Sequence, residues 1–125
     1  MGKQALDYFG RFMMEHFRDR SIDFFNLLAA GHWKAPALQE LQSSLATLDA
    51  EQLGFVREAM IATIDTGLHD FLFRLQETTN FGNDVQVLAL GENVVPLSDG
   101  LHGELFGEDG WRARFSRFGV PETGV

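Results

Sequence analysis

One stretch of the sequence constrains the fold more than any other: between Leu53 and Leu75, apolar side chains recur every three or four residues. That spacing places them on one face of a helix. Asp49 precedes the stretch as an N-cap, and Gln52, three residues later, completes the pattern of a capping box. The sequence therefore predicts a long helix from about Asp49 to Glu77, with the other elements packed around it.

Shorter helical patterns flank this central helix. They predict further helices at about residues 3–18, 21–31, 36–48 and 111–118. After Thr78 the helical spacing stops, and residues 85–95 are typical of a short β-hairpin with a tight turn at residues 91–93. The predicted fold is mainly α, a helical bundle around a long central helix with a minor short β-hairpin. We expect residues 1–125 to form a single domain.

The net charge of −8 comes from 18 acidic and 10 basic residues, with histidine counted as neutral. Such a chain repels nucleic-acid phosphates and anionic lipids, so we expect no nucleic-acid partner and no membrane partner. Because it has no cysteine, disulfides and thiol chemistry are excluded. We find no secretory signal and no apolar run of membrane-spanning length, which favours a cytoplasmic protein. No motif indicates a cofactor or a catalytic residue.

The acidic residues are concentrated in residues 84–110, which we call the acidic segment. It contains six acids and no base, whereas three arginines follow it directly. Exposed arginines near acids commonly form ion pairs within the molecule, so we expect each arginine to pair with an acid of this segment. The arginines are Arg112, Arg114 and Arg117, and the acids expected to pair with them are Glu104, Glu108 and Asp109.

Two interpretations of the acidic segment remain open. In one, it is a solvated loop whose charge only keeps the protein soluble. In the other, it is a binding surface whose charge attracts a basic protein and favours the correct partner. The residues predicted to contact such a partner are Asp99, Glu104, Glu108 and Asp109.

Two pairs of histidine and carboxylate residues suggest an alternative function. Asp65 and His69 are four residues apart on the central helix, so they lie on one face, and His102 and Glu104 are close together in the acidic segment. If the fold brings all four together, they could bind a metal ion in a small metal-binding protein or metal-dependent enzyme. In the simpler interpretations, Asp65 only orients His69, or both are partly exposed at the edge of the core.

The chain contains twelve phenylalanines, most of them at helical spacing. Phe24 and Phe25, like Phe71 and Phe73, point in different directions around their helices, so some aromatic surface is expected outside the core. A structural homodimer would use such a surface, and this is a third interpretation of the protein.

Two passages resemble a group of known proteins. They are IDTGLHDFLF at residues 64–73 and LSDGLHGEL at residues 97–105, the second followed by Gly110-Trp111 and Phe115-Ser116. Both resemble small, acidic, single-domain bacterial proteins of unassigned function, a group that overlaps immunity proteins of polymorphic and contact-dependent toxin systems. The resemblance covers about the C-terminal half of the chain. It implies a protein-binding module, an immunity-like inhibitor that presents an acidic surface to a basic toxin domain.

Overall fold

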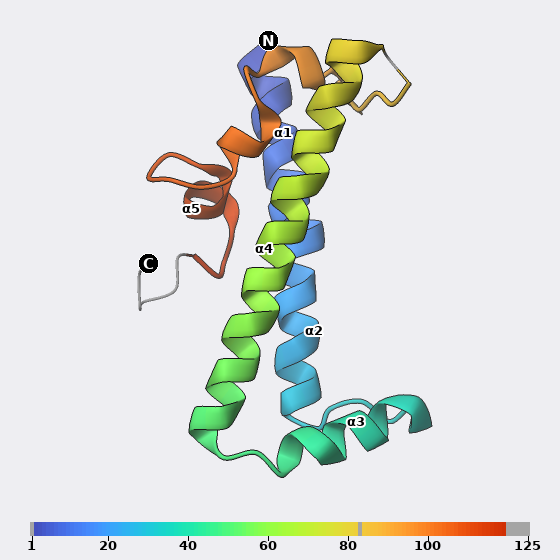
Figure 1. Ribbon diagram of the computed structural model, residues 1–125, viewed down its shortest axis with the longest axis vertical. Coiled ribbons are helices and arrows are strands. Elements are labelled where there is room, and N and C mark those ends of the chain that lie inside the picture. The colour runs from blue at the N-terminus through green and yellow to red at the C-terminus, as the bar shows by residue number, and fades with distance from the viewer. Residues whose placement is uncertain (1, 83, 120–125) are drawn as a thin grey trace.

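The computed structural model describes residues 2–82 and 84–119, and two long helical rods lying side by side form most of it (Figure 1). The first rod joins three helices end to end: α1 (Gly2–Met13), the π-helix η1 (Met14–Arg18) and α2 (Asp19–Ala29). The second rod is one helix, α4 (Ala50–Phe81). The predicted mainly α fold around a long central helix is therefore confirmed.

The start of α4 follows from its capping box. The Asp49 carboxylate accepts a hydrogen bond from the Gln52 backbone N–H at 2.8 Å, and the Gln52 side-chain oxygen accepts one from the Asp49 N–H at 3.0 Å. Both bonds satisfy N–H groups that have no partner within the helix. The helix ends at Phe81, four residues beyond the predicted Glu77. Its buried side chains are Ile61, Asp65, Leu68, Leu72 and Leu75.

The first rod differs from the prediction at Ser21, where we expected a second helix to begin. The backbone remains helical through this position, and the only irregularity is η1, three residues earlier. A π-helical turn contains one extra residue, so it rotates the side chains that follow it relative to a regular α-helix. In this way η1 lets both Arg18 and Asp19 face the interior.

The shorter helix α3 (Pro36–Ala46) crosses the lower end of the two rods (Figure 1). Gly31 ends the first rod in the left-handed conformation, with φ 70°, and Pro36 occupies the first turn of α3, where its missing N–H costs nothing. The buried side chain of Gln42 then holds the connection in place through two 2.8 Å hydrogen bonds to the backbone of Trp33.

A short hairpin follows α4 and is confirmed in outline. Its strands are β1 (Leu88–Ala89) and β2 (Glu92–Asn93), which pair in the antiparallel sense. The turn lies at Leu90 and Gly91, and not at residues 91–93 as predicted. The φ angles of both residues are positive, which tight hairpin turns favour. Beyond β2 the chain forms the 3₁₀ helices η2 (Val95–Leu97) and η3 (Leu101–Glu104), and then α5 (Trp111–Phe115).

The hydrophobic core lies in the upper half of the molecule, where three layers meet: the first rod, α4, and the segment from β1 to α5. Trp111 is completely buried, and its indole packs so closely on Gly10 that a Cβ atom there would come within 2.4 Å of the ring. Phe9 meets the same indole edge to face. The other buried members of this core are Ala5, Leu6, Met13, Met14, Leu68, Leu72, Leu75, Ala89, Val94, Val95, Leu101 and Leu105.

Although α4 has 32 residues, neither it nor any other helix in the described part of the chain contains an apolar stretch that could cross a membrane.

Candidate functional site

The four acids predicted to bind a partner lie on one flank of the molecule, in the segment that contains η3 and the turn before α5. This segment is the orange and red part of the ribbon that stands beside the rods in Figure 1. Asp99, Glu108 and Asp109 are exposed, and Glu104 is half-buried. The Glu104 carboxylate accepts a 2.7 Å hydrogen bond from the hydroxyl of Ser98.

Buried contacts hold this acidic flank against the helices. The Gln76 side chain on α4 accepts a hydrogen bond from the Leu101 N–H at 2.9 Å and donates one to the Val95 carbonyl at 3.4 Å. Leu101, Leu105 and Trp111 are fully buried beneath the acids. The carboxylates therefore stand on a packed backbone platform. Less conformational entropy is lost on binding when that backbone is already ordered.

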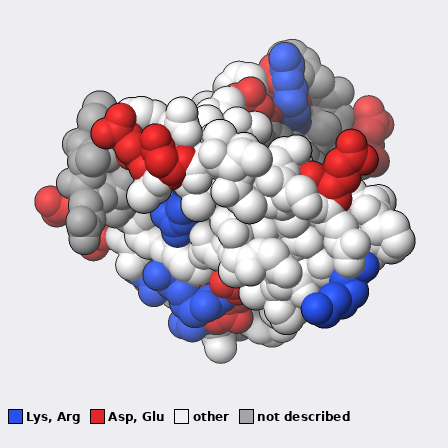
Figure 2. Space-filling view, turned by 90° about the horizontal axis from the view of Figure 1, so that it is seen from below, with Lys and Arg blue, Asp and Glu red and all other residues white. Residues whose placement is uncertain are grey.

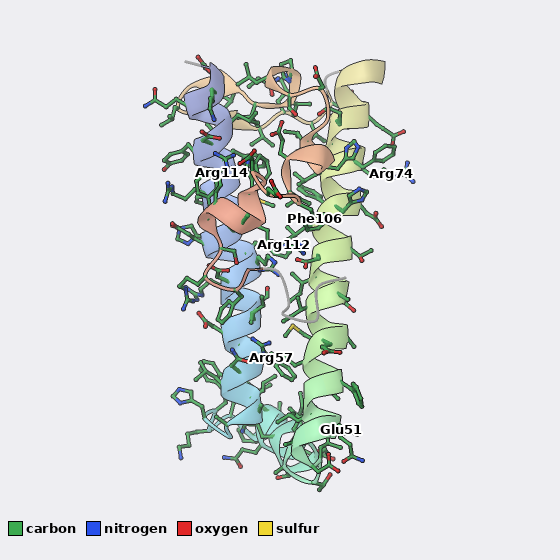
Figure 3. All side chains as sticks on the ribbon, turned by 90° about the vertical axis from the view of Figure 1, so that its left-hand side faces the viewer. Glu51, Arg57, Arg74, Phe106, Arg112 and Arg114 are labelled. Atoms are coloured by element: carbon green, nitrogen blue, oxygen red, sulfur yellow. The ribbon has the colours of Figure 1, made fainter. Side chains whose placement is uncertain are left out.

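The three arginines after the acidic segment do not pair with its acids, so this part of the prediction is wrong. Arg112 bonds to Asp65 at 3.2 Å and Arg114 to Asp7 at 3.1 Å, whereas Arg117 bonds to Asp23. Arg112 and Arg114 lie on α5, in front of the two rods in Figure 3. The acids that pair with the three arginines belong to α1, α2 and α4.

The three arginines consequently form their salt bridges with acids outside the acidic segment. Among the described residues, no acid of the acidic segment forms a salt bridge with a lysine or arginine; these acids are Asp84, Glu92, Asp99, Glu104, Glu108 and Asp109. One of the arginines still lies close to the segment, because Arg114 donates a 2.8 Å hydrogen bond to the backbone carbonyl of Asp109, but the Asp109 carboxylate is not within salt-bridge distance of it.

The opposite end of the molecule has a different character. Figure 2 shows it from below, where acidic and basic side chains stand in small separate groups around a largely uncharged centre. The helix α3 at this end contains one acid and no base. At this end acidic and basic side chains are both present.

The strongest polar cluster was not predicted from the sequence. Arg18 is 1% exposed, and its guanidinium forms two hydrogen bonds with the Asp65 carboxylate, at 2.6 Å and 3.3 Å. It also donates to the Ser116 hydroxyl at 2.8 Å and to the Phe118 carbonyl. Asp19, equally buried, accepts a 2.5 Å hydrogen bond from Ser116. We call Arg18, Asp19, Asp65, Arg112 and Ser116 the Arg18 cluster.

The Arg18 cluster satisfies its own charges. Both guanidinium groups, of Arg18 and Arg112, bond to the buried Asp65 carboxylate, and Asp19 accepts hydrogen bonds from the Ser116 hydroxyl and from the Arg117 backbone N–H, the latter at 2.9 Å. Buried charges are tolerated when they are paired and hydrogen-bonded in this way. The cluster therefore ties the chain after α5 to both rods, although Arg112 Nε is buried without a hydrogen-bond partner among the described residues. Asp65 in the apolar stripe of α4 was the one sequence signal that pointed to it.

The four residues of the metal hypothesis are only partly brought together. The rings of His69 and His102 meet edge to face with centroids 5.2 Å apart, and His69 Nδ1 lies 3.3 Å from the Asp70 carboxylate. Asp65 is buried and bonded to arginines, so neither interpretation of it as a partner of His69 or as an exposed residue holds. Glu104 bonds to Ser98. Over residues 2–82 and 84–119, three or more potential ligands never gather where they could hold an ion.

A groove lies between the two rods. It has a volume of about 570 Å³ and is mostly apolar. We call it the aromatic groove, and its lining residues are His16, Phe17, Arg20, Ser21, Phe24, Phe25, Leu28, Met60 and Ile64. Among the described residues, its lining includes none from the acidic segment and none from α5.

We compared the chain with protein-family models, with curated proteins and with solved structures, and found no significant match in any of the three.

Proposed function

We propose that the protein is a protein-binding module that presents an acidic surface to a basic partner, in the manner of an immunity-type inhibitor. The observation that carries this proposal is the absence of salt bridges in the acidic segment among the described residues. Arg112, Arg114 and Arg117, which directly follow the segment, all bond to other acids.

Carboxylates on a packed platform are suited to protein recognition. Complementary charge accelerates the encounter with a basic protein and disfavours acidic competitors. Because the platform is held by Gln76 and the buried Trp111, the backbone that carries the acids does not have to be ordered when the partner arrives. The contact residues under this proposal are Asp99, Glu104, Glu108 and Asp109.

The test uses the intact chain as bait in an extract of its own cells at low salt, followed by purification of each captured protein. The affinity of that protein is then measured for the wild type and for a triple variant, Glu104→Gln/Glu108→Gln/Asp109→Asn. We expect the variant to bind about 10 to 100 times more weakly, with a smaller dependence of Kd on salt.

A matched control removes three acids from elsewhere on the molecule. Glu40, Glu51 and Glu58 are exposed on α3 and α4 and form no salt bridge among the described residues, so their replacement by glutamine changes the net charge by the same amount. If this control weakens binding as much as the triple variant, or if the captured proteins carry no basic surface, the proposal is wrong.

A further inference from the structure

The lower half of the molecule leaves large aromatic side chains in solvent. Phe17 is 50% exposed and Phe24 is 42% exposed, and both line the aromatic groove. Phe12, also half-exposed, stacks on His16 at the edge of the same groove. Met60 and Ile64 form the opposite wall on α4. Contiguous apolar surface of this kind marks an interaction site more often than it marks free surface.

No described element covers this flank. In Figure 1 the rods stand alone on the side away from α5, between α3 at the foot and the loop after α4 at the top.

The shape of this flank is self-complementary. Phe17 and Phe24 are seven residues apart and form a ridge along the first rod, and the groove runs directly beside them. A twofold-symmetric dimer requires a protrusion and a matching hollow on the same face, and this flank has both. In four-helix bundles, the side-chain ridges of one helix likewise pack into the groove between two others.

The size and the charge of the flank also suit a second copy. Residues 12–28 extend about 25 Å and two helices are about 20 Å wide, so two copies that pack over this whole flank bury about 1,000 Å² in total. Specific interfaces begin at about that size. The groove lining contains no acid, and Arg20 and His16 are its only ionisable groups. The groove itself therefore contributes no carboxylate to a contact between two chains with a charge of −8.

We propose that a second copy of this chain docks in the aromatic groove. The two pairs of rods form a symmetric four-helix dimer in which Phe17 and Phe24 of each copy enter the groove of the other. The acidic flank faces outward in both copies. This inference does not rest on the proposed function, because the two surfaces share no residue.

The experiment measures the mass of the intact protein in solution by sedimentation equilibrium from about 1 to about 100 µM, a range that resolves a micromolar Kd. We expect the mass to reach twice the 14.0 kDa of one chain. A wild type that stays at 14.0 kDa throughout overturns the proposal.

The variant Phe17→Glu/Phe24→Glu locates the interface. We expect it to remain monomeric across the range, with unchanged helical circular dichroism. The matched control is Phe55→Glu, because Phe55 is 61% exposed on α4 and does not line the groove. It should dimerise as the wild type does. If the double variant loses helicity, Ser21→Arg takes its place, since it adds a charge to the groove and keeps every phenylalanine. A folded variant that dimerises like the wild type refutes this interface.

Discussion

Replacing Arg18 by methionine tests whether the Arg18 cluster holds the first rod, α4 and the chain after α5 together. The guanidinium is 1% exposed and donates to Asp65, Ser116 and the Phe118 carbonyl. Methionine fills a similar volume but donates nothing, so it leaves the buried Asp65 carboxylate with fewer partners and removes a donor from the Ser116 hydroxyl that bonds to Asp19. Asp65 keeps its 3.2 Å bond to Arg112, which limits the damage.

We expect Arg18→Met to lower the free energy of unfolding by about 3 to 5 kcal/mol, the usual cost of removing one member of a buried ion pair. A domain of this size has only about 5 to 15 kcal/mol in total. With a denaturant slope of about 2 kcal/mol per molar, the urea midpoint should fall by roughly 2 M. Helical circular dichroism during urea unfolding measures both values.

The matched control is Arg74→Met. Arg74 bonds to Glu77 at 2.8 Å, but its side chain is 78% exposed, so the same substitution should cost less than about 0.5 kcal/mol. A triple variant, Arg18→Met/Asp65→Leu/Arg112→Met, removes the Asp65 carboxylate together with its second partner and should recover at least about 1 kcal/mol relative to Arg18→Met. A loss below about 1 kcal/mol for Arg18→Met would refute the reasoning, because the cluster would then be held by solvent and not by its internal pairs.

Four further variants test local features. Gly10→Ala should destabilise the fold by about 1 to 3 kcal/mol in thermal unfolding, because its Cβ would meet Trp111 at 2.4 Å, whereas Gly54→Ala, with open space on α4, should stabilise it by about 0.5 to 1 kcal/mol. Asp49→Ala should cost about 1 kcal/mol in urea unfolding through loss of the capping box, and no loss would contradict the assigned cap. Partial burial alone would raise the pKa of Asp7, but hydrogen bonds and positive charge from Lys3 and Arg114 outweigh it and lower that pKa. The stabilising contribution of Asp7 is therefore complete above its unfolded pKa of about 3.9 and is lost as the pH falls through the lower folded value, so Asp7→Asn should flatten the decline of the urea midpoint in acid.

Local signals predicted the elements well. The capping box of Asp49 and Gln52 and the helical spacing after it depend only on residues three or four positions apart, so the start and the face of α4 were readable from the sequence. The hairpin was also found, but its turn was placed one residue too late because Leu90, a poor candidate for a positive φ, occupies its first position.

Pairing between distant segments was not readable. Arg114 was expected to bind acids within ten residues, yet it bonds to Asp7, which is 107 residues away. Arg18 likewise meets Asp65 and Ser116 across 47 and 98 residues. Periodicity shows which face of a helix is buried but carries no information about which charges meet across the core. A buried acid in an apolar stripe, as at Asp65, indicates that a basic partner exists, but it does not identify which residue that partner is.

The sequence separation within the Arg18 cluster also affects synthesis of the chain. Ser116 follows Arg18 by 98 residues, so at roughly 5 to 20 residues per second the ribosome releases it on the order of 5 to 20 s later. Until then, neither Arg18 nor Asp19 can be buried with its full set of partners. During this interval the Arg18 side of the first rod stays in contact with water, and the nascent chain is open to chaperones and to aggregation there.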